Sequence, residues 1–318
     1  MRIFPGLLFL TAAAAAQQLV SVEKIWDEGA HNAFTDLVRF RDRWLCTFRE
    51  DTGHASASGR IRVIESRDGK TWKSAALVEE SGIDLRDPKF AVTPQGKLML
   101  VMGGSVMEGK QYVNRRPRVS FSGDGRVWTA PRPILSDGDW LWRVTWHKGK
   151  AYGVSYHGGG GLRNVRRRAF LYAGDGIHYE RIGEFEPSET SECTIRFAAN
   201  DEMVVLARSG NETRIGTSFP PYRSFRWTVL AGALGGPNFI PLPDGRWVAG
   251  SRGRNKEGPE TVLSWMTRTT YTPFLTLPSG GDNSYPGLVW HEGLLWVSYY
   301  STHEGKTSIY LAKVRLPQ

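Results

Sequence analysis

The chain has 318 residues, of which 41 are Lys or Arg and 32 are Asp or Glu, so its formal net charge is +9. Its hydrophobic fraction of 40% and its 12 tryptophans can fill a core, which excludes a disordered chain. Together with 36 glycines and 17 prolines, this composition predicts many short strands separated by turns, and therefore an all-β protein.

The first segment, residues 1–16, has the pattern of a secretory signal peptide. A basic start is followed by an apolar run from Ile3 to Ala16, whose small final residues suit cleavage after Ala16. The run is shorter than the roughly 20 apolar residues that a membrane-spanning helix needs. We therefore expect a mature chain of residues 17–318, secreted or periplasmic, with no membrane span.

One pattern then occurs six times, at intervals of roughly 50 residues. In each copy two short apolar strands flank a polar or glycine turn and form a β-hairpin. The six hairpins are predicted over Phe34–Arg49, Lys89–Ser105, Val144–His157, Cys193–Arg208, Phe239–Arg252 and Tyr285–Ser301. Third strands are predicted over Arg60–Ser66, Arg118–Ser122, Arg168–Ala173 and Thr261–Met266.

Units of this size with three or four strands match the blades of a β-propeller. Six copies predict a six-bladed propeller that forms a single domain over residues 17–318. The terminal segments Leu19–Ile25 and Ile309–Leu316 are expected in the same last sheet, where they would close the ring. A β-sandwich, the competing layout, does not produce this repeat.

Two turns after third strands carry nearly the same residues. Ser66–Trp72 reads S-x-D-G-x-T-W, Ser122–Trp128 repeats it, and Asp175–Tyr179 is a weaker copy. The Asp can accept backbone N–H groups, the Gly can adopt a positive φ, and the Trp can pack on the sheet. These turns resemble the Asp-boxes of bacterial sialidases and related BNR-repeat proteins, each one residue shorter than usual, and we expect them to be structural.

Polar side chains gather where the inner strands begin and where the second strands end. In a propeller these positions share one face, so they predict a ligand site at the mouth of the axial channel. For any single residue the alternative is an ion pair at a solvated rim. The candidates are His31, Asn32, Asp36, Arg49, Glu50, Arg86, Asp87, Lys89, Arg143, His157, Glu192, Arg208, Asn238, Arg252, Asp282, Tyr285 and Tyr300.

Four of these residues resemble the catalytic set of the sialidases in chain order and blade position. They are Glu192, Arg208, Arg252 and Tyr285. The resemblance implies a retaining glycoside hydrolase in which Tyr285 is the nucleophile and Glu192 takes its proton. It also implies that Arg208 and Arg252 bind a substrate carboxylate. We expect Tyr285 and Glu192 to lie within hydrogen-bond distance, facing a pocket that holds both arginines.

Sialidases carry one more arginine at the start of the first blade, where this chain has His31–Asp36. Candidates to supply that charge from a neighbouring position are Arg49, Arg86 and Arg143. Asp87 and Asn238 complete the expected substrate-binding set. For the acid/base group, residue type favours Asp51 in the loop after the first hairpin, with Asp87 and His54 as further candidates.

No metal-hydrolase, phosphate-binding or serine-hydrolase motif occurs, so we expect neither a metal nor a cofactor. The one dense basic cluster, residues 163–168, follows a glycine run and predicts a solvated loop rather than a nucleic-acid surface. The resemblance therefore implies an exported exo-glycosidase of the sialidase type that acts on a terminal sugar of a glycan, with an acidic sugar favoured and a neutral glycoside as the alternative. The alternatives are a carbohydrate-binding propeller without activity and a propeller whose rim binds a protein.

Overall fold

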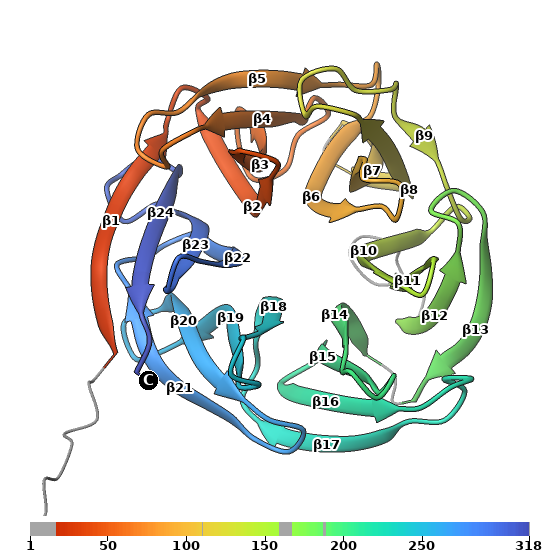
Figure 1. The fold of residues 1–318 in the computed structure, drawn as a ribbon. Coiled ribbons are helices and arrows are strands. Elements are labelled where there is room, and N and C mark those ends of the chain that lie inside the picture. Colours follow the sequence, from red (N-terminus) through yellow and green to blue (C-terminus); the bar gives the residue numbers. More distant parts are fainter. Residues whose placement is uncertain (1–16, 110, 159–166, 187–188, 318) are drawn as a thin grey trace, which may run out of the picture.

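The computed structural model describes residues 17–109, 111–158, 167–186 and 189–317. The predicted signal peptide and most of the basic cluster at 163–168 lie outside these residues. The described residues form six four-stranded antiparallel sheets arranged in a ring around an axis (Figure 1). The predicted all-β, six-bladed propeller is therefore confirmed.

In the first three blades the strands follow the chain order from the axis outward. Blade 1 comprises β2 (His31–Phe40), β3 (Arg43–Asp51), β4 (Arg60–Ser66) and β5 (Lys73–Val78). Blade 2 comprises β6 (Asp84–Val92), β7 (Leu98–Glu108), β8 (Gln111–Ser122) and β9 (Arg132–Pro133). Blade 3 comprises β10 (Asp139–His147), β11 (Lys150–His157), β12 (Arg168–Gly174) and β13 (Tyr179–Phe185).

The remaining blades have the same order, except that the N-terminal strand lies outermost in blade 6. Blade 4 comprises β14 (Thr190–Phe197), β15 (Met203–Ser209), β16 (Glu212–Ser218) and β17 (Arg226–Ala231). Blade 5 comprises β18 (Gly235–Pro241), β19 (Trp247–Arg254), β20 (Pro259–Met266) and β21 (Tyr271–Leu277). Blade 6 comprises β22 (Asn283–His291), β23 (Leu294–Ser301), β24 (Ser308–Arg315) and β1 (Gln18–Trp26).

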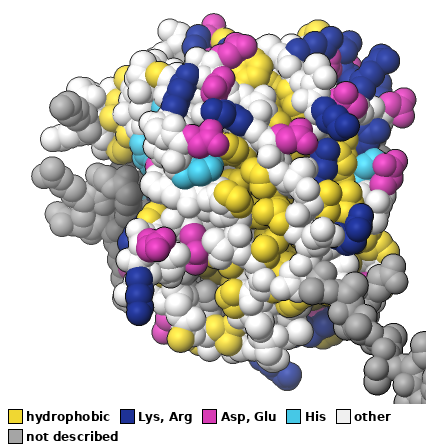
Figure 2. Space-filling view, turned by 90° about the vertical axis from the view of Figure 1, so that its left-hand side faces the viewer, with side chains coloured by type: hydrophobic (Ala, Val, Ile, Leu, Met, Phe, Trp, Pro, Cys, Tyr) yellow, Lys and Arg dark blue, Asp and Glu magenta, His cyan; other side chains and the backbone are white. Residues whose placement is uncertain are grey.

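The two ends of the chain close the ring in blade 6, as predicted. The N-terminal strand β1 pairs antiparallel with the C-terminal strand β24, with Leu19 opposite Val314. No described residue belongs to a helix of the length and hydrophobicity needed to cross a bilayer. On the side of the molecule around β1, acidic and basic side chains lie among apolar ones (Figure 2).

All six inner strands share one irregularity. In each, three residues span the same length as two residues of the neighbouring strand, which defines a β-bulge. The bulges fall between Ala33 and Asp36, Arg86 and Lys89, Leu141 and Val144, Thr190 and Cys193, Gly235 and Asn238, and Ser284 and Gly287. Several predicted hairpins start later in the chain than the observed strands do. The bulge interrupts the alternation of apolar and polar residues by which a strand is recognised in sequence.

The aspartate turns have the geometry expected from the sequence. Asp68 Oδ1 accepts the backbone N–H groups of Lys70 and Thr71 at 2.9 Å, and Gly69 has a φ of 69°. These hydrogen bonds lower the pKa of Asp68 to about 2. Asp124 and Asp175 cap their turns in the same way, so these residues hold the strands together at the outer part of the blades.

Below the bulges the axis is filled by buried polar side chains. Arg143 donates two hydrogen bonds to Asp36, at 2.8 and 3.1 Å, and thereby links blades 3 and 1. The Lys89 ammonium is 2% exposed and donates to the backbone carbonyls of Thr35 and Pro88. Burial and the charge of Arg143 lower the pKa of Lys89 to about 8.

The buried ammonium of Lys89 predicts a pH-dependent stability. Between pH 8 and the ordinary lysine pKa of about 10.4, the unfolded chain binds more protons than the folded protein, so stability rises with pH. Relative to Lys89→Met, wild type should gain up to about 3 kcal/mol of unfolding free energy across this range. Urea denaturation at several pH values measures the difference. Substitution of the exposed Lys97 by Met should show no such trend. If the difference in unfolding free energy between wild type and Lys89→Met did not change with pH, the lowered pKa of Lys89 would be contradicted.

Candidate functional site

A cavity of about 220 Å³ opens at the end of the ring where the inner strands begin. It is lined by residues of five blades: Phe34, His54, Arg86, Asp87, Ser105, Tyr112, Arg115, Trp140, Tyr156, Glu192 and Tyr285. Four of them, Phe34, Asp87, Glu192 and Tyr285, belong to the bulges of the inner strands. The repeated bulge therefore brings side chains from separate blades to one place.

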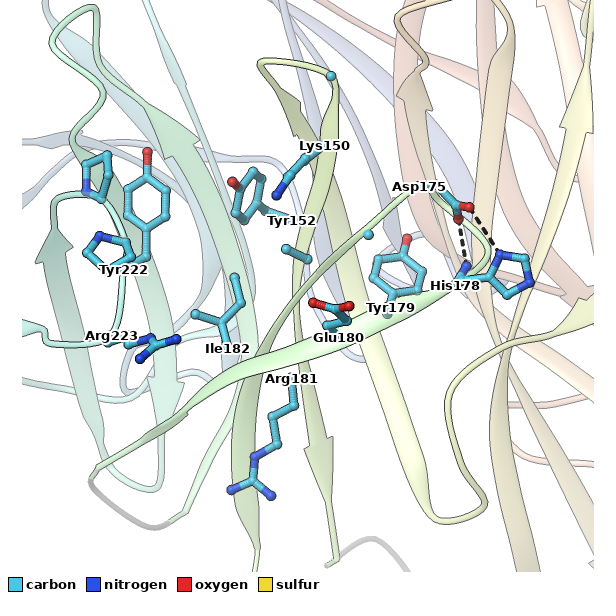
Figure 3. A pocket seen from close by; sticks show the side chains of 15 residues that line it. Lys150, Tyr152, Asp175, His178, Tyr179, Glu180, Arg181, Ile182, Tyr222 and Arg223 are labelled. Carbon is cyan, nitrogen blue, oxygen red and sulfur yellow. Dashed lines mark hydrogen bonds and ion pairs between the residues drawn. The ribbon is translucent and has the colours of Figure 1, made fainter.

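A larger groove of about 680 Å³ lies at the opposite ends of the strands, between blades 3 and 4 (Figure 3). Its walls include Lys150 and Tyr152 from β11 and Tyr222 from the segment after β16. None of the predicted site residues lines it. The axial cavity is therefore the candidate site, although it is the smaller of the two.

Tyr285 and Glu192 meet inside the axial cavity. The Tyr285 hydroxyl donates a hydrogen bond of 2.8 Å to Glu192 Oε1, and the two residues are 7% and 6% exposed. Glu192 also accepts hydrogen bonds from Arg208 Nη1, at 3.0 Å, and from the Gly236 backbone N–H, at 2.6 Å. Three donors thus hold the Glu192 carboxylate in a fixed position beside the phenol.

The surroundings of Tyr285 keep its phenol protonated. Burial and the negative charge of Glu192 raise its pKa well above the ordinary value, and the positive charges of Arg252 and Arg208 only partly oppose them. A neutral phenol is a weak nucleophile. Tyr285 can attack only if its proton moves as it reacts, and Glu192 is the acceptor within reach.

Arg208 and Arg252 lie next to this pair, but neither is among the residues that line the cavity, whereas we expected both to face it. The Arg252 guanidinium lies 5.0 Å from the centre of the Tyr285 ring, and the Arg208 side chain is 39% exposed. Gly235 separates them, since a Cβ there would lie 3.8 Å from Arg208 Nη1 and 3.5 Å from Arg252 Cβ. The Arg252 guanidinium beside the phenol also donates hydrogen bonds to the Asn283 carbonyl, at 2.6 Å, and to the Tyr300 hydroxyl, at 2.8 Å.

Arg86, Asp87 and His54 also line the cavity. Asp87 Oδ1 is buried and has no hydrogen-bond partner among the described residues. Burial raises the pKa of Asp87 even though Arg86 and Lys89 oppose this effect. His54 stands at the cavity with its side chain 53% exposed.

Asp51 and Arg49 do not line the cavity. Arg49 is fully buried, donates a hydrogen bond of 2.8 Å to Asp84, and pairs with Asp51. Asp51 also accepts hydrogen bonds from the Thr52 backbone and the Ser58 hydroxyl. Both residues therefore brace the loop after β3, and Asp51 is not placed where an acid/base group would meet a ligand.

Arg143 and Asn238 are likewise held away from the cavity lining. Arg143 is engaged by Asp36, while Asn238 accepts a hydrogen bond of 3.0 Å from Arg196. Of the three candidates for the missing arginine, only Arg86 lines the cavity. Sequence reasoning missed Tyr112 and Arg115, because β8 begins at Gln111 and is longer than the predicted Arg118–Ser122.

The sequence matches no protein family model and no curated protein. Among solved structures, a protein of unknown function from Dyadobacter fermentans has a TM-score of 0.80 and 17% identity, covering 95% of this chain and 99% of that protein. The α-L-arabinofuranosidase Arb93A of Fusarium graminearum has a TM-score of 0.72 and 14% identity, covering 93% and 98%. Trypanosoma rangeli sialidase has a TM-score of 0.72 and 13% identity, covering 95% and 60%. These likenesses show the fold, a six-bladed propeller of the sialidase type.

Gly236 provides a test of how tightly the site is packed. Its φ is +59°, and a Cβ there would lie 2.5 Å from Tyr285 Cγ. Gly236→Ala should cost about 1–2 kcal/mol of backbone strain and about 1–3 kcal/mol of overpacking. Gly210→Ala, at a φ of +56° with open space, should cost only the strain. Urea denaturation measures the free energy of unfolding of both variants. Equal losses would show that the Tyr285 ring can move aside without cost, and that the site is not tightly packed.

Proposed function

We propose that this protein is a retaining exo-glycosidase that releases a terminal acidic sugar from a glycan. The observation that carries the proposal is the 2.8 Å hydrogen bond from Tyr285 to Glu192 beside Arg208 and Arg252. We also propose that residues 1–16 act as a signal peptide that directs export of the protein. Glycosidases among the similar structures, a sialidase and an arabinofuranosidase, support this general class.

In the proposed reaction Tyr285 Oη attacks the anomeric carbon as the glycosidic bond breaks, and its proton passes to Glu192 Oε1. Water then displaces the Tyr285 oxygen, which recovers its proton from Glu192. A phenol is suited to this role because a carboxylate nucleophile would be repelled by a carboxylate next to the anomeric carbon. Arg208 donates a hydrogen bond to the same oxygen of Glu192 and so helps to hold it beside the phenol. The enzyme thus generates its nucleophile only at the moment of attack.

The arginines account for an acidic substrate. A guanidinium group donates two parallel hydrogen bonds to a carboxylate, and Arg208 and Arg252 stand together beside the nucleophile. Arg86 supplies a third positive charge at the cavity wall. Asp87, whose Oδ1 has no hydrogen-bond partner among the described residues, stands at the cavity wall where it can pair with a sugar hydroxyl. A cavity of about 220 Å³ fits one terminal sugar better than a chain.

A second candidate function is sugar binding without turnover. The observation in its favour is that Arg49 and Arg143, two of the three possible substitutes for the absent first-blade arginine, are engaged by Asp84, Asp51 and Asp36. A site with fewer cations binds an acidic sugar less tightly. Glycan binding with no hydrolysis would select this candidate.

Hydrolysis of a panel of aryl glycosides, covering acidic sugars and arabinofuranose, tests the proposal. Wild type should release the aryl group from an acidic sugar with retention of configuration, which NMR detects. Tyr285→Phe and Glu192→Gln should lower kcat/KM by about 10³-fold or more, because the nucleophile or its base is lost. A fluorinated substrate that slows the second step should attach to Tyr285, which peptide mass spectrometry detects.

Tyr152→Phe is the matched control, since Tyr152 lies in the groove of Figure 3 and not in the axial cavity. Its activity should equal that of wild type. Equal rates for Tyr285→Phe and wild type would reject Tyr285 as the nucleophile. Faster hydrolysis of neutral glycosides than of acidic ones would reject the assigned substrate class.

A further inference from the structure

Three side chains beside the cavity remain without a role in the steps described above. His54 Nδ1 lies 2.6 Å from Asp282 Oδ2, and His31 Nε2 lies 3.2 Å from the same oxygen. The three atoms all lie within 4.8 Å of one another. Two imidazoles and a carboxylate in this arrangement can share either a metal ion or protons.

The contacts of Asp282 favour protons. Burial alone would raise the pKa of Asp282, but hydrogen bonds from His31, His54 and Tyr300 hold it well below its usual range. An ionised carboxylate only accepts hydrogen bonds, so both histidine nitrogens that face it carry hydrogen. Its other oxygen already accepts a hydrogen bond of 2.9 Å from Tyr300 and lies 3.4 Å from the cationic Arg252.

His31 gives an independent argument against a metal ion. Its Nδ1 is buried and has no hydrogen-bond partner among the described residues. A metal on Nε2 would place the remaining hydrogen on Nδ1, where metal-binding histidines normally donate to an acceptor. A second proton on His31 would leave the same buried donor unsatisfied, which is costly. His31 is therefore best placed as a hydrogen-bond donor from Nε2 to Asp282.

His54 is the member of the cluster that can exchange a proton. Its Nδ1–H is held by Asp282, so its Nε2 is the nitrogen that can meet a ligand, and its side chain is 53% exposed at the cavity. The His54 ring stands edge-on to Phe34 at 5.1 Å, and Phe34 lies 5.3 Å from the Tyr285 ring. One aromatic ring thus separates His54 from the nucleophile.

We propose that His54 is the acid–base catalyst of the site and that Asp282 and His31 are its positioning residues. This inference rests on the proposed function. In the first step His54 Nε2–H protonates the glycosidic oxygen as its bond to the anomeric carbon breaks and Tyr285 attacks. In the second step neutral His54 takes a proton from the water that attacks this carbon. The Tyr285 oxygen leaves and recovers its proton from Glu192, so the sum is one glycoside and one water giving a sugar and an alcohol.

The position of the leaving group separates His54 from the carboxylate candidates. In exo-cleavage the leaving group carries the rest of the glycan, so it must lie at the open mouth of the cavity. His54 is half-exposed in the loop after β3, whereas Asp87 belongs to an inner strand and one of its two carboxylate oxygens, Oδ1, is buried. Asp51 is held by Arg49 and its own loop. Asp282 orients the His54 ring through Nδ1, as the aspartate does in other histidine–aspartate pairs.

A series of leaving groups tests the role of His54. His54→Gln should lower kcat/KM by about 10²–10⁴-fold for poor leaving groups such as alkyl alcohols, and by far less for dinitrophenol, which needs no protonation. Asp282→Asn should show a smaller loss with the same dependence. Added azide should restore turnover of the dinitrophenyl substrate by His54→Gln. The exposed His178→Gln, far from the cavity, is the matched control and should behave as wild type.

Several outcomes would overturn the inference while leaving the glycosidase intact. One is an equal loss for all leaving groups in His54→Gln, or the leaving-group dependence in Asp87→Asn instead. Another is stoichiometric Zn²⁺ binding, measured by calorimetry, that His54→Gln abolishes. Nitrogen-15 NMR of the protein without substrate shows which ring nitrogen of His54 carries the hydrogen. The hydrogen should be on Nδ1 in wild type, and this preference should be lost in Asp282→Asn. If wild type hydrolyses no glycoside, the inference and the proposed function fail together.

Discussion

The repeated bulge in the inner strands is the constraint on which this structure depends. One extra residue in each strand turns neighbouring side chains toward the axis, where six blades converge. Phe34, Asp87 and Tyr285 adopt positive φ at these positions, at 65°, 50° and 53°. Such conformations cost about 1–3 kcal/mol each and persist only where the surrounding structure holds them. The paired strands of the closed ring supply that support.

Charged residues at the strand ends either stabilise the fold or lie at the candidate site, and the sequence alone does not distinguish the two roles. Arg49 with Asp84 and Arg143 with Asp36 are buried pairs that hold the loop and the axis together. Arg208 with Glu192 is a pair of the same kind, but Glu192 lines the cavity and the Arg208 side chain is 39% exposed. An ion pair that only stabilises the fold and one that can also meet a ligand therefore differ in how accessible the arginine is.

The two halves of the proposed chemistry are built on opposite sides of Phe34. Tyr285 and Glu192 form a buried pair in which the proton stays on the phenol until attack. His54 is half-exposed and is joined to Asp282, which also approaches Arg252. A buried nucleophile and an accessible proton donor are what release of a terminal sugar from a larger glycan requires.

The sequence by itself determined the number of blades, because alternating apolar residues and turn residues report hairpins locally. The choice of Tyr285, Glu192, Arg208 and Arg252 came from a resemblance in their order and stays a prediction. The sequence did not separate Asp51, Arg49, Arg143 and Asn238 from the cavity residues, nor did it reveal that Asp282 and His31 support His54. Only the tertiary structure decided these points. The direction of a side chain at a bulge depends on backbone φ and on the adjacent blade, and Tyr285 meets a partner 93 residues away in the chain. Local patterns carry no information about either.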